Sequence, residues 1–84
     1  MDDKILVIVE LPAAGKAFEV WIPVNVRMEL VQNELAEMLA GLSNGMFLRT
    51  DPVVLIDRSN GTILNINATA AQLDLQQGAQ LLLI

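Results

Sequence analysis

The fold is decided by the last five residues of the sequence, Gln80-Leu81-Leu82-Leu83-Ile84. A run of consecutive aliphatic residues in so short a segment is typical of a strand that is buried on both faces in the middle of a sheet. A second apolar run, Lys4 to Leu11, stands near the beginning of the chain and is rich in β-branched residues. The sequence therefore predicts a strand at each end of the chain.

A hairpin is predicted in the first quarter of the chain. The segment 17–22 alternates in hydropathy, which is typical of a strand with one face on a core. Pro12-Ala13-Ala14-Gly15-Lys16 connects it to the first strand, and so short a connection favours an antiparallel pair. One face of this second strand carries Phe18, Val20 and Ile22, and the other carries Ala17, Glu19 and Trp21.

One amphipathic helix is predicted after Pro23, which cannot donate to a strand ladder. Asn25 is the predicted cap, because its side chain can accept a hydrogen bond from a free N–H of the first turn. Gly41 and the cluster Ser43-Asn44-Gly45 predict the end of the helix. The apolar residues at helical spacing, which we expect to face the core, are Met28, Val31, Leu35, Met38, Leu39 and Leu42.

The second half of the chain is predicted to return to strands. Val53 to Asp57 forms a third strand, and Asn60-Gly61 predicts a tight turn, because both residues tolerate a positive φ. A fourth strand from Thr62 to Ile66 follows, and then a helical or 3₁₀ turn within Asn67 to Leu75. Gln76-Gln77-Gly78 is the turn that leads into the last strand.

This order, two strands, a helix, two strands, a turn and a last strand, is that of an α+β protein with the β-grasp arrangement. We expect one domain over residues 1–84, in which a mixed sheet packs on one amphipathic helix. In such a sheet the first and last strands are central, parallel neighbours, which accounts for the apolar character of both. A chain of 84 residues has room for a single core only.

The composition limits what the protein can bind. The net charge is −5, so the chain lacks the basic stripe that nucleic-acid binding needs, and anionic membrane surfaces repel it. No apolar run approaches the roughly 20 residues of a spanning helix, and the run Ile5 to Val9 is too short and too close to acidic residues for a signal peptide. We therefore expect a cytoplasmic protein that neither binds nucleic acid nor inserts into a membrane.

Residues suited to catalysis are scarce. The chain has no His, Cys or Tyr, which removes most general bases and nucleophiles. Ser43 and Ser59 lie in predicted turns without a His to activate them, and Ala14-Gly15-Lys16 lacks the flanking residues of a phosphate-binding loop. Metal binding would need clustered ligands, and Asp2 and Asp3 at the terminus are poor ones. We expect a protein that is not an enzyme and that carries no cofactor and no metal.

Packing and turn residues in the last part of the chain follow the pattern L…T…L-x-L-x-x-G-x-x-L-x-L, which is carried by Leu64, Thr69, Leu73, Leu75, Gly78, Leu81 and Leu83. This spacing resembles that of ubiquitin-like domains. The likeness covers essentially the whole chain, and motifs of this kind specify a fold better than an activity.

Among ubiquitin-like proteins, the chain resembles the small YukD/EsaB-like proteins of bacterial type VII secretion systems. It is also similar to the ubiquitin-like domain of the EccD membrane component of those systems. The resemblance implies an accessory protein that binds other secretion proteins and is not conjugated. Ubiquitin-like modifiers and sulfur carriers need a C-terminal Gly-Gly, and no Gly follows Gly78. A modifier or sulfur carrier whose C-terminus a partner enzyme activates is the alternative, which would require the native chain to continue beyond Ile84.

Strand alternation predicts an apolar patch on the sheet face opposite the helix. We expect this patch to bind a protein partner, such as a secretion-system component, because exposed apolar patches and Trp side chains are typical of interfaces. The alternatives are that the patch closes a homodimer or that loops of the chain partly cover it. The predicted binding residues are Leu6, Ile8, Trp21, Leu82 and Ile84, to which the third strand adds Val54 or Ile56.

Overall fold

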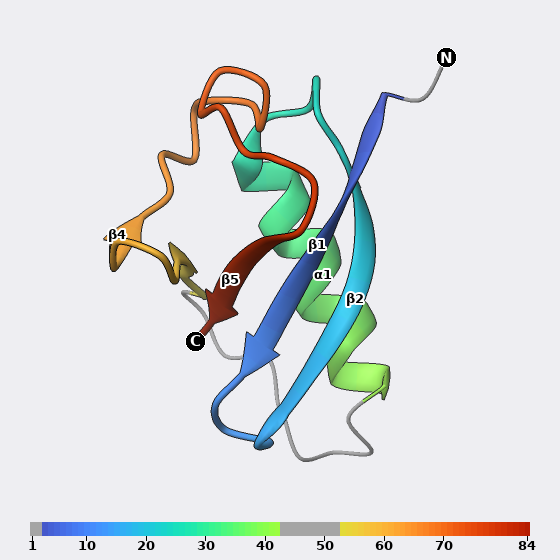
Figure 1. The fold of residues 1–84 in the computed structure, drawn as a ribbon. Coiled ribbons are helices and arrows are strands. Elements are labelled where there is room, and N and C mark those ends of the chain that lie inside the picture. The colour runs from blue at the N-terminus through green and yellow to red at the C-terminus, as the bar shows by residue number, and fades with distance from the viewer. Residues whose placement is uncertain (1–2, 43–52) are drawn as a thin grey trace.

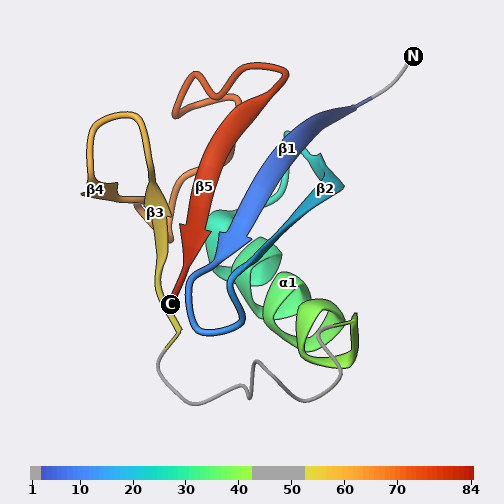
Figure 2. The ribbon, with the colours of Figure 1, turned by 60° about the horizontal axis from the view of Figure 1, so that its bottom comes forward.

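The structure, a computed structural model, describes residues 3–42 and 53–84, in which a mixed β-sheet packs on one helix (Figure 1). The strands lie in the order β2-β1-β5-β3-β4. Figure 1 looks onto the sheet with α1 behind it, and Figure 2 shows the same arrangement turned by 60°. The elements are β1 (Lys4–Leu11), β2 (Lys16–Pro23), α1 (Met28–Leu42), β3 (Leu55–Asp57), β4 (Thr62–Ile63) and β5 (Ala79–Leu83).

The two strands from opposite ends of the chain are neighbours in the middle of the sheet. β1 and β5 run parallel, with Val7 opposite Ala79 and Val9 opposite Leu81. β1 also pairs antiparallel with β2, and β5 pairs antiparallel with β3. The predicted β-grasp topology with central, parallel first and last strands is therefore confirmed.

The core lies between α1 and one face of the sheet, and strand alternation selects its residues. Val7 and Val9 on β1 are fully buried, whereas Leu6 and Ile8, which alternate with them, are only half-buried. The same alternation buries Leu81 and Leu83 on β5 and Val20 and Ile22 on β2, so the predicted phase of these three strands is confirmed. The helix contributes Met28, Val31, Leu35, Ala36 and Leu39 to this core.

Two residues that were expected in the core lie on the surface of α1 instead. Met38 and Leu42 are 43% and 53% exposed. The buried stripe runs through Leu35 and Leu39, and Met38 precedes Leu39 by one residue, which turns it by about 100° around the helix axis. Ala36 takes the remaining place against the sheet, so the prediction for Met38 and Leu42 was wrong. The predicted helix stop at 43–45 lies outside the described residues.

The helix begins later than predicted and is capped by main-chain groups from a distant loop. The carbonyl of Arg27 accepts the N–H groups of Leu30 and Val31, which makes Arg27 the capping position and the Asn25 prediction wrong. The N–H groups of Met28 and Glu29 donate to the carbonyls of Ala68 and Ile66 over 2.8 and 3.0 Å. These orphan donors therefore need no side-chain cap.

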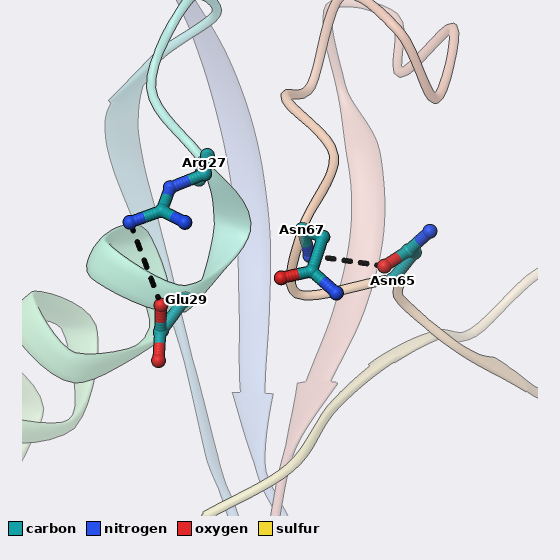
Figure 3. A network of polar contacts seen from close by, with 4 residues as sticks. All are labelled: Arg27, Glu29, Asn65 and Asn67. Atoms are coloured by element: carbon teal, nitrogen blue, oxygen red, sulfur yellow. Dashed lines mark hydrogen bonds and ion pairs between the residues drawn. The ribbon is translucent and has the colours of Figure 1, made fainter.

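The helix start and the loop that caps it carry further polar contacts (Figure 3). The Arg27 guanidinium lies 3.7 Å from a carboxylate oxygen of Glu29 in the first helical turn. In the facing loop, the N–H of Asn67 donates to Asn65 Oδ1 over 2.9 Å. The fourth strand is shorter than predicted, since β4 covers Thr62–Ile63 and not Thr62 to Ile66, and this Asx turn occupies part of the remaining segment.

The connection between β3 and β4 consists of residues 58–61, the four residues that the predicted strand bounds leave between the two strands. Asp57 pairs with Thr62, and Gly61 donates its N–H to the Asp57 carbonyl. Gly61 has a φ of 73°, whereas Asn60, which could tolerate a positive φ, does not adopt one. The Asn60 side chain instead accepts from the N–H and the hydroxyl of Thr62, which fixes a four-residue loop.

The segment before β5 forms the predicted helical turn, with a cap at each end. Thr69 Oγ1 accepts the N–H of Gln72 over 3.1 Å, and Gln72 Oε1 accepts the N–H of Thr69 over 3.0 Å, which is a capping box. At the other end, the N–H of Leu75 donates to Ala70 and that of Asp74 to Ala71, while Asp74 has a φ of 59°. This is the Schellman arrangement, with Asp74 in the place that Gly usually takes.

Candidate functional site

The sheet face opposite α1, called here the outer sheet face, gathers the side chains that the sequence predicted as a binding patch. In Figure 1 the viewer looks onto this face, and no described loop lies in front of the middle of β1, β2 and β5. Alternation and strand register together place side chains of all five strands on it. They include Ala17, Glu19 and Trp21 on β2, Lys4, Leu6, Ile8 and Glu10 on β1, Gln80 and Leu82 on β5, Ile56 on β3 and Ile63 on β4.

One end of the outer sheet face carries an apolar cluster around Trp21. Trp21 lies opposite Leu6 in the β1–β2 ladder, and its side chain is 56% exposed. Ile8 follows on β1 and is half-buried. Gln77 fixes the backbone beneath Leu6, because its Oε1 accepts the Leu6 N–H over 2.9 Å. We call Trp21, Leu6 and Ile8 the tryptophan cluster.

A second apolar row crosses the other end of the face. Leu82 on β5 lies opposite Ile56 on β3, and Ile56 in turn lies opposite Ile63 on β4. Ile84 continues beyond β5 and is 55% exposed, and it exchanges two backbone hydrogen bonds with Val54. The sequence did not fix which residues of the third strand face outward. Val53 and Leu55 are buried, so alternation places both Val54 and Ile56 on the outer sheet face. We call Leu82, Ile56, Ile63, Ile84 and Val54 the isoleucine cluster.

An ion pair lies across the face between these two clusters. Arg58 Nη1 lies 2.8 Å from Glu10 Oε1, and the Arg58 backbone N–H donates to the carbonyl of Gln80. Since Glu10 is on β1 and opposite Leu82, the Arg58 side chain must cross β5 to reach it. The predicted patch is thus apolar at both ends and polar in the middle, and the sequence analysis missed this pair.

The polar groups elsewhere are used in turns. Ser59 donates both its N–H and its hydroxyl to Asp57 Oδ1, so this hydroxyl serves the β3–β4 loop. An open groove lies between this loop and residues 73–80. A polar side chain at its edge is also used within a turn, because Gln76 Nε2 donates to Asp74 Oδ1.

Within residues 3–42 and 53–84, no three His, Cys, Asp or Glu residues are grouped as a metal ion would require. In the same part of the chain, none of the helical structure is both long and apolar enough to cross a membrane.

Comparison with known proteins supports the fold. No protein-family model and no curated protein matches the chain. Among solved structures, the EccD5 ubiquitin-like domain from Mycobacterium xenopi is similar at a TM-score of 0.85 and 13% identity, over 99% of this chain and 94% of that one. The ubiquitin-like domain of the Mycobacterium tuberculosis type VII secretion protein ECCD1 is similar at a TM-score of 0.78 and 13% identity, over 100% and 99% of the two chains.

A third similar structure is a larger assembly. A chain of the MycP5-free ESX-5 inner membrane complex matches at a TM-score of 0.84 and 15% identity, over 99% of this chain and 21% of that one. Identities this low are informative about backbone architecture alone. Together with the observed topology, they establish that this chain has the ubiquitin-like fold.

Proposed function

We propose that this protein is a non-enzymatic interaction module of the YukD/EsaB-like kind, which binds components of a type VII secretion system in the bacterial cytoplasm. The observation that carries the interaction role is the exposed Trp21 on the outer sheet face. The secretion context is supported by likeness to ubiquitin-like domains named as EccD5 and ECCD1. Both parts of the proposal require a partner that covers the outer sheet face.

Among the residues that the structure describes, Trp21 is not part of the core. An indole that is 56% exposed leaves much of its apolar surface in water, although the core beneath β2 is already filled by Val20 and Ile22. Trp residues flanked by half-buried aliphatic side chains are typical anchors of protein interfaces. The tryptophan cluster is therefore the expected centre of the contact.

The layout of the face also indicates what the partner must present. An apolar partner surface would cover the tryptophan cluster, while groups near β5 would have to hydrogen-bond the Glu10–Arg58 pair. A flat and purely apolar partner would remove water from this ion pair without replacing the hydrogen bonds that the two side chains make to water, which costs binding energy. We expect a partner with an aliphatic or aromatic anchor and adjacent polar groups.

Affinity capture with matched variants tests the proposal. Trp21→Asp places a charge in the tryptophan cluster, and Ala13→Asp places the same charge at an exposed position in the β1–β2 turn. The wild-type protein and Ala13→Asp should recover secretion-membrane components from the bacterium of origin, and Trp21→Asp should lose them. Equal recovery by both variants would refute the role of the outer sheet face, and recovery of other proteins alone would refute the secretion context.

Self-association is distinguished by a second measurement on the same variants. Light scattering after size-exclusion chromatography gives the mass of each protein in solution. A monomeric wild-type protein leaves the outer sheet face available to a different partner. A dimer that Trp21→Asp converts to monomers would show instead that the face binds a second copy of the chain.

A further inference from the structure

The loop between β3 and β4 carries a dipeptide that the outer sheet face does not use. Asn60 and Gly61 are both exposed in this loop, which stands at one edge of the molecule (Figure 2). Gly61 has a φ of 73°, a conformation that favours glycine, although a Cβ at this position would meet no atom within 4 Å. The backbone of the loop therefore favours a glycine directly after an asparagine.

An asparagine that is followed by glycine can lose ammonia without an enzyme. A base from the solvent takes the proton of the Gly61 N–H, and this nitrogen then bonds to Asn60 Cγ. The bond from Cγ to the side-chain nitrogen breaks, and that nitrogen leaves as ammonia after it takes up a proton from water. A water molecule opens the resulting cyclic imide at either carbonyl, which gives aspartate or isoaspartate at position 60. Glycine permits the ring closure because it has no side chain that would obstruct its nitrogen.

The loop binds both groups that would have to react. The Gly61 N–H donates to the Asp57 carbonyl over 2.8 Å. A carbonyl oxygen does not remove this proton, and a base from the solvent cannot reach it while the hydrogen bond persists. Asn60 Oδ1 accepts the N–H and the hydroxyl of Thr62 over 3.0 and 2.6 Å, which restricts the motion of the Asn60 side chain.

Ser59 holds the same loop closed from the other side. Its N–H and its hydroxyl donate to Asp57 Oδ1 over 2.9 and 2.7 Å. Separation of Gly61 from Asp57 is therefore a local opening in which several hydrogen bonds of one short loop are lost together. Openings of this kind occur in a small fraction of molecules without unfolding of the domain.

We propose that Asn60 is a deamidation site, and that the hydrogen bond from Gly61 to Asp57 controls its rate. Asn60 reacts in those molecules in which the loop is open, and it is protected in the closed loop. The proposal depends neither on the role of Trp21 nor on a secretion partner.

The two products differ in their effect on the outer sheet face. Aspartate keeps a side-chain oxygen as the acceptor for Thr62 and adds one negative charge to the net charge of −5. Isoaspartate inserts a methylene group into the main chain between residues 60 and 61, inside the loop that joins β3 to β4. Since Ile56 pairs with Ile63 close to this loop, isoaspartate disturbs the isoleucine cluster.

Mass spectrometry of aged protein tests the proposal. The purified protein is kept at physiological temperature and pH, either folded or in urea, beside a synthetic peptide of residues 56–64. We expect Asn60 to react in the peptide and in urea, and to react at least about tenfold more slowly in the folded protein, because the bonds of the loop must first break. Equal rates in the folded protein and in the peptide would overturn the control by the loop. An Asn60 that stays intact in the peptide and in urea would overturn the site itself.

Two variants distinguish opening of the loop from unfolding of the domain. Ser59→Ala removes the hydroxyl that donates to Asp57, and it should speed the reaction in the folded protein by about two- to tenfold. Thr69→Ala removes a hydrogen bond from the turn before β5, and it should leave the rate at Asn60 unchanged. If Ser59→Ala has no effect, or if Thr69→Ala speeds the reaction equally, the bond from Gly61 to Asp57 does not set the rate.

NMR spectroscopy tests the effect of the isoaspartate product. The aspartate and isoaspartate forms of the aged protein are separated chromatographically and compared with Asn60→Asp, which contains the aspartate from the start. We expect the amide signals of Ile56 and Ile63 to stay near their wild-type positions in Asn60→Asp and to shift in the isoaspartate form. Unchanged signals in the isoaspartate form would refute the effect on the isoleucine cluster.

Discussion

Glu10 and Arg58 meet across the central strand β5, with 2.8 Å between the carboxylate Oε1 and the guanidinium Nη1. They belong to β1 and to the end of β3, which are not neighbours in the sheet. The pair therefore ties the two halves of the sheet together on the outer face and divides the apolar surface there. Both side chains remain partly exposed, which limits the strength of the pair.

A double-mutant cycle on Glu10→Gln and Arg58→Met should give a coupling free energy of about 0.2–1 kcal/mol. The value is small because water and salt screen a pair of this exposure. Urea denaturation of the four proteins measures it, and a repeat at high salt should reduce it. A coupling that is absent at low salt would show that the pair does not form in solution.

Adjacent residues of β5 should differ in their contribution to stability. Leu81 is fully buried against α1, whereas Leu82 is half-buried on the outer sheet face. We expect Leu81→Ala to lower the free energy of unfolding by about 2–5 kcal/mol and Leu82→Ala by about 1 kcal/mol. Chemical denaturation of the two variants measures the difference. Equal losses would mean that the outer sheet face is covered and that the site is placed on the wrong side of the sheet.

The capping box before β5 gives a local prediction. Thr69→Ala removes the acceptor of the Gln72 N–H and should cost about 1 kcal/mol of stability. Thr69→Ser keeps the hydroxyl and serves as the control, with a loss that should be clearly smaller. If Thr69→Ser and Thr69→Ala destabilise the protein equally, the hydroxyl does not act as a cap.

Asp74 should be replaceable by glycine with a gain in stability. Its φ of 59° is strained for a residue with a side chain and ordinary for glycine. Asp74→Gly should raise the free energy of unfolding by up to about 1 kcal/mol, because it removes this strain. The gain is reduced by the loss of the hydrogen bond that Gln76 Nε2 donates to Asp74 Oδ1. Asp74→Val should lower it, because a β-branched residue tolerates this conformation poorly. Thermal denaturation compares the three proteins, and a stability order with Val above Gly would contradict the structure.

Local patterns were sufficient to predict the sheet and its two faces. The alternation of Val7 and Val9 with Leu6 and Ile8 gave the phase of β1, because strand side chains point to opposite faces with a period of two. The same reasoning placed Trp21 and Leu82 on the outer sheet face before any contact between strands was known.

Features that depend on distant segments could not be predicted in this way. Asn25 was a reasonable cap by residue type, but the carbonyls of Ile66 and Ala68 take the free N–H groups of the helix start. Nothing near Glu10 in the sequence indicates Arg58, since only the fold brings them together. The capping box of Thr69 and Gln72 is different, because its T-x-x-Q spacing is local and could have been found in the sequence.

Site-specific photo-crosslinking in living cells tests the central claim most directly. A photoreactive phenylalanine analogue is placed at position 21 on the outer sheet face or at position 13 in the exposed β1–β2 turn. We expect position 21 to crosslink to partner proteins, among them a component of the secretion membrane complex, and we expect position 13 to give no such product. Crosslinks that are absent at position 21, or that are the same at both positions, would contradict the claim that this domain binds its partner through the face that carries Trp21.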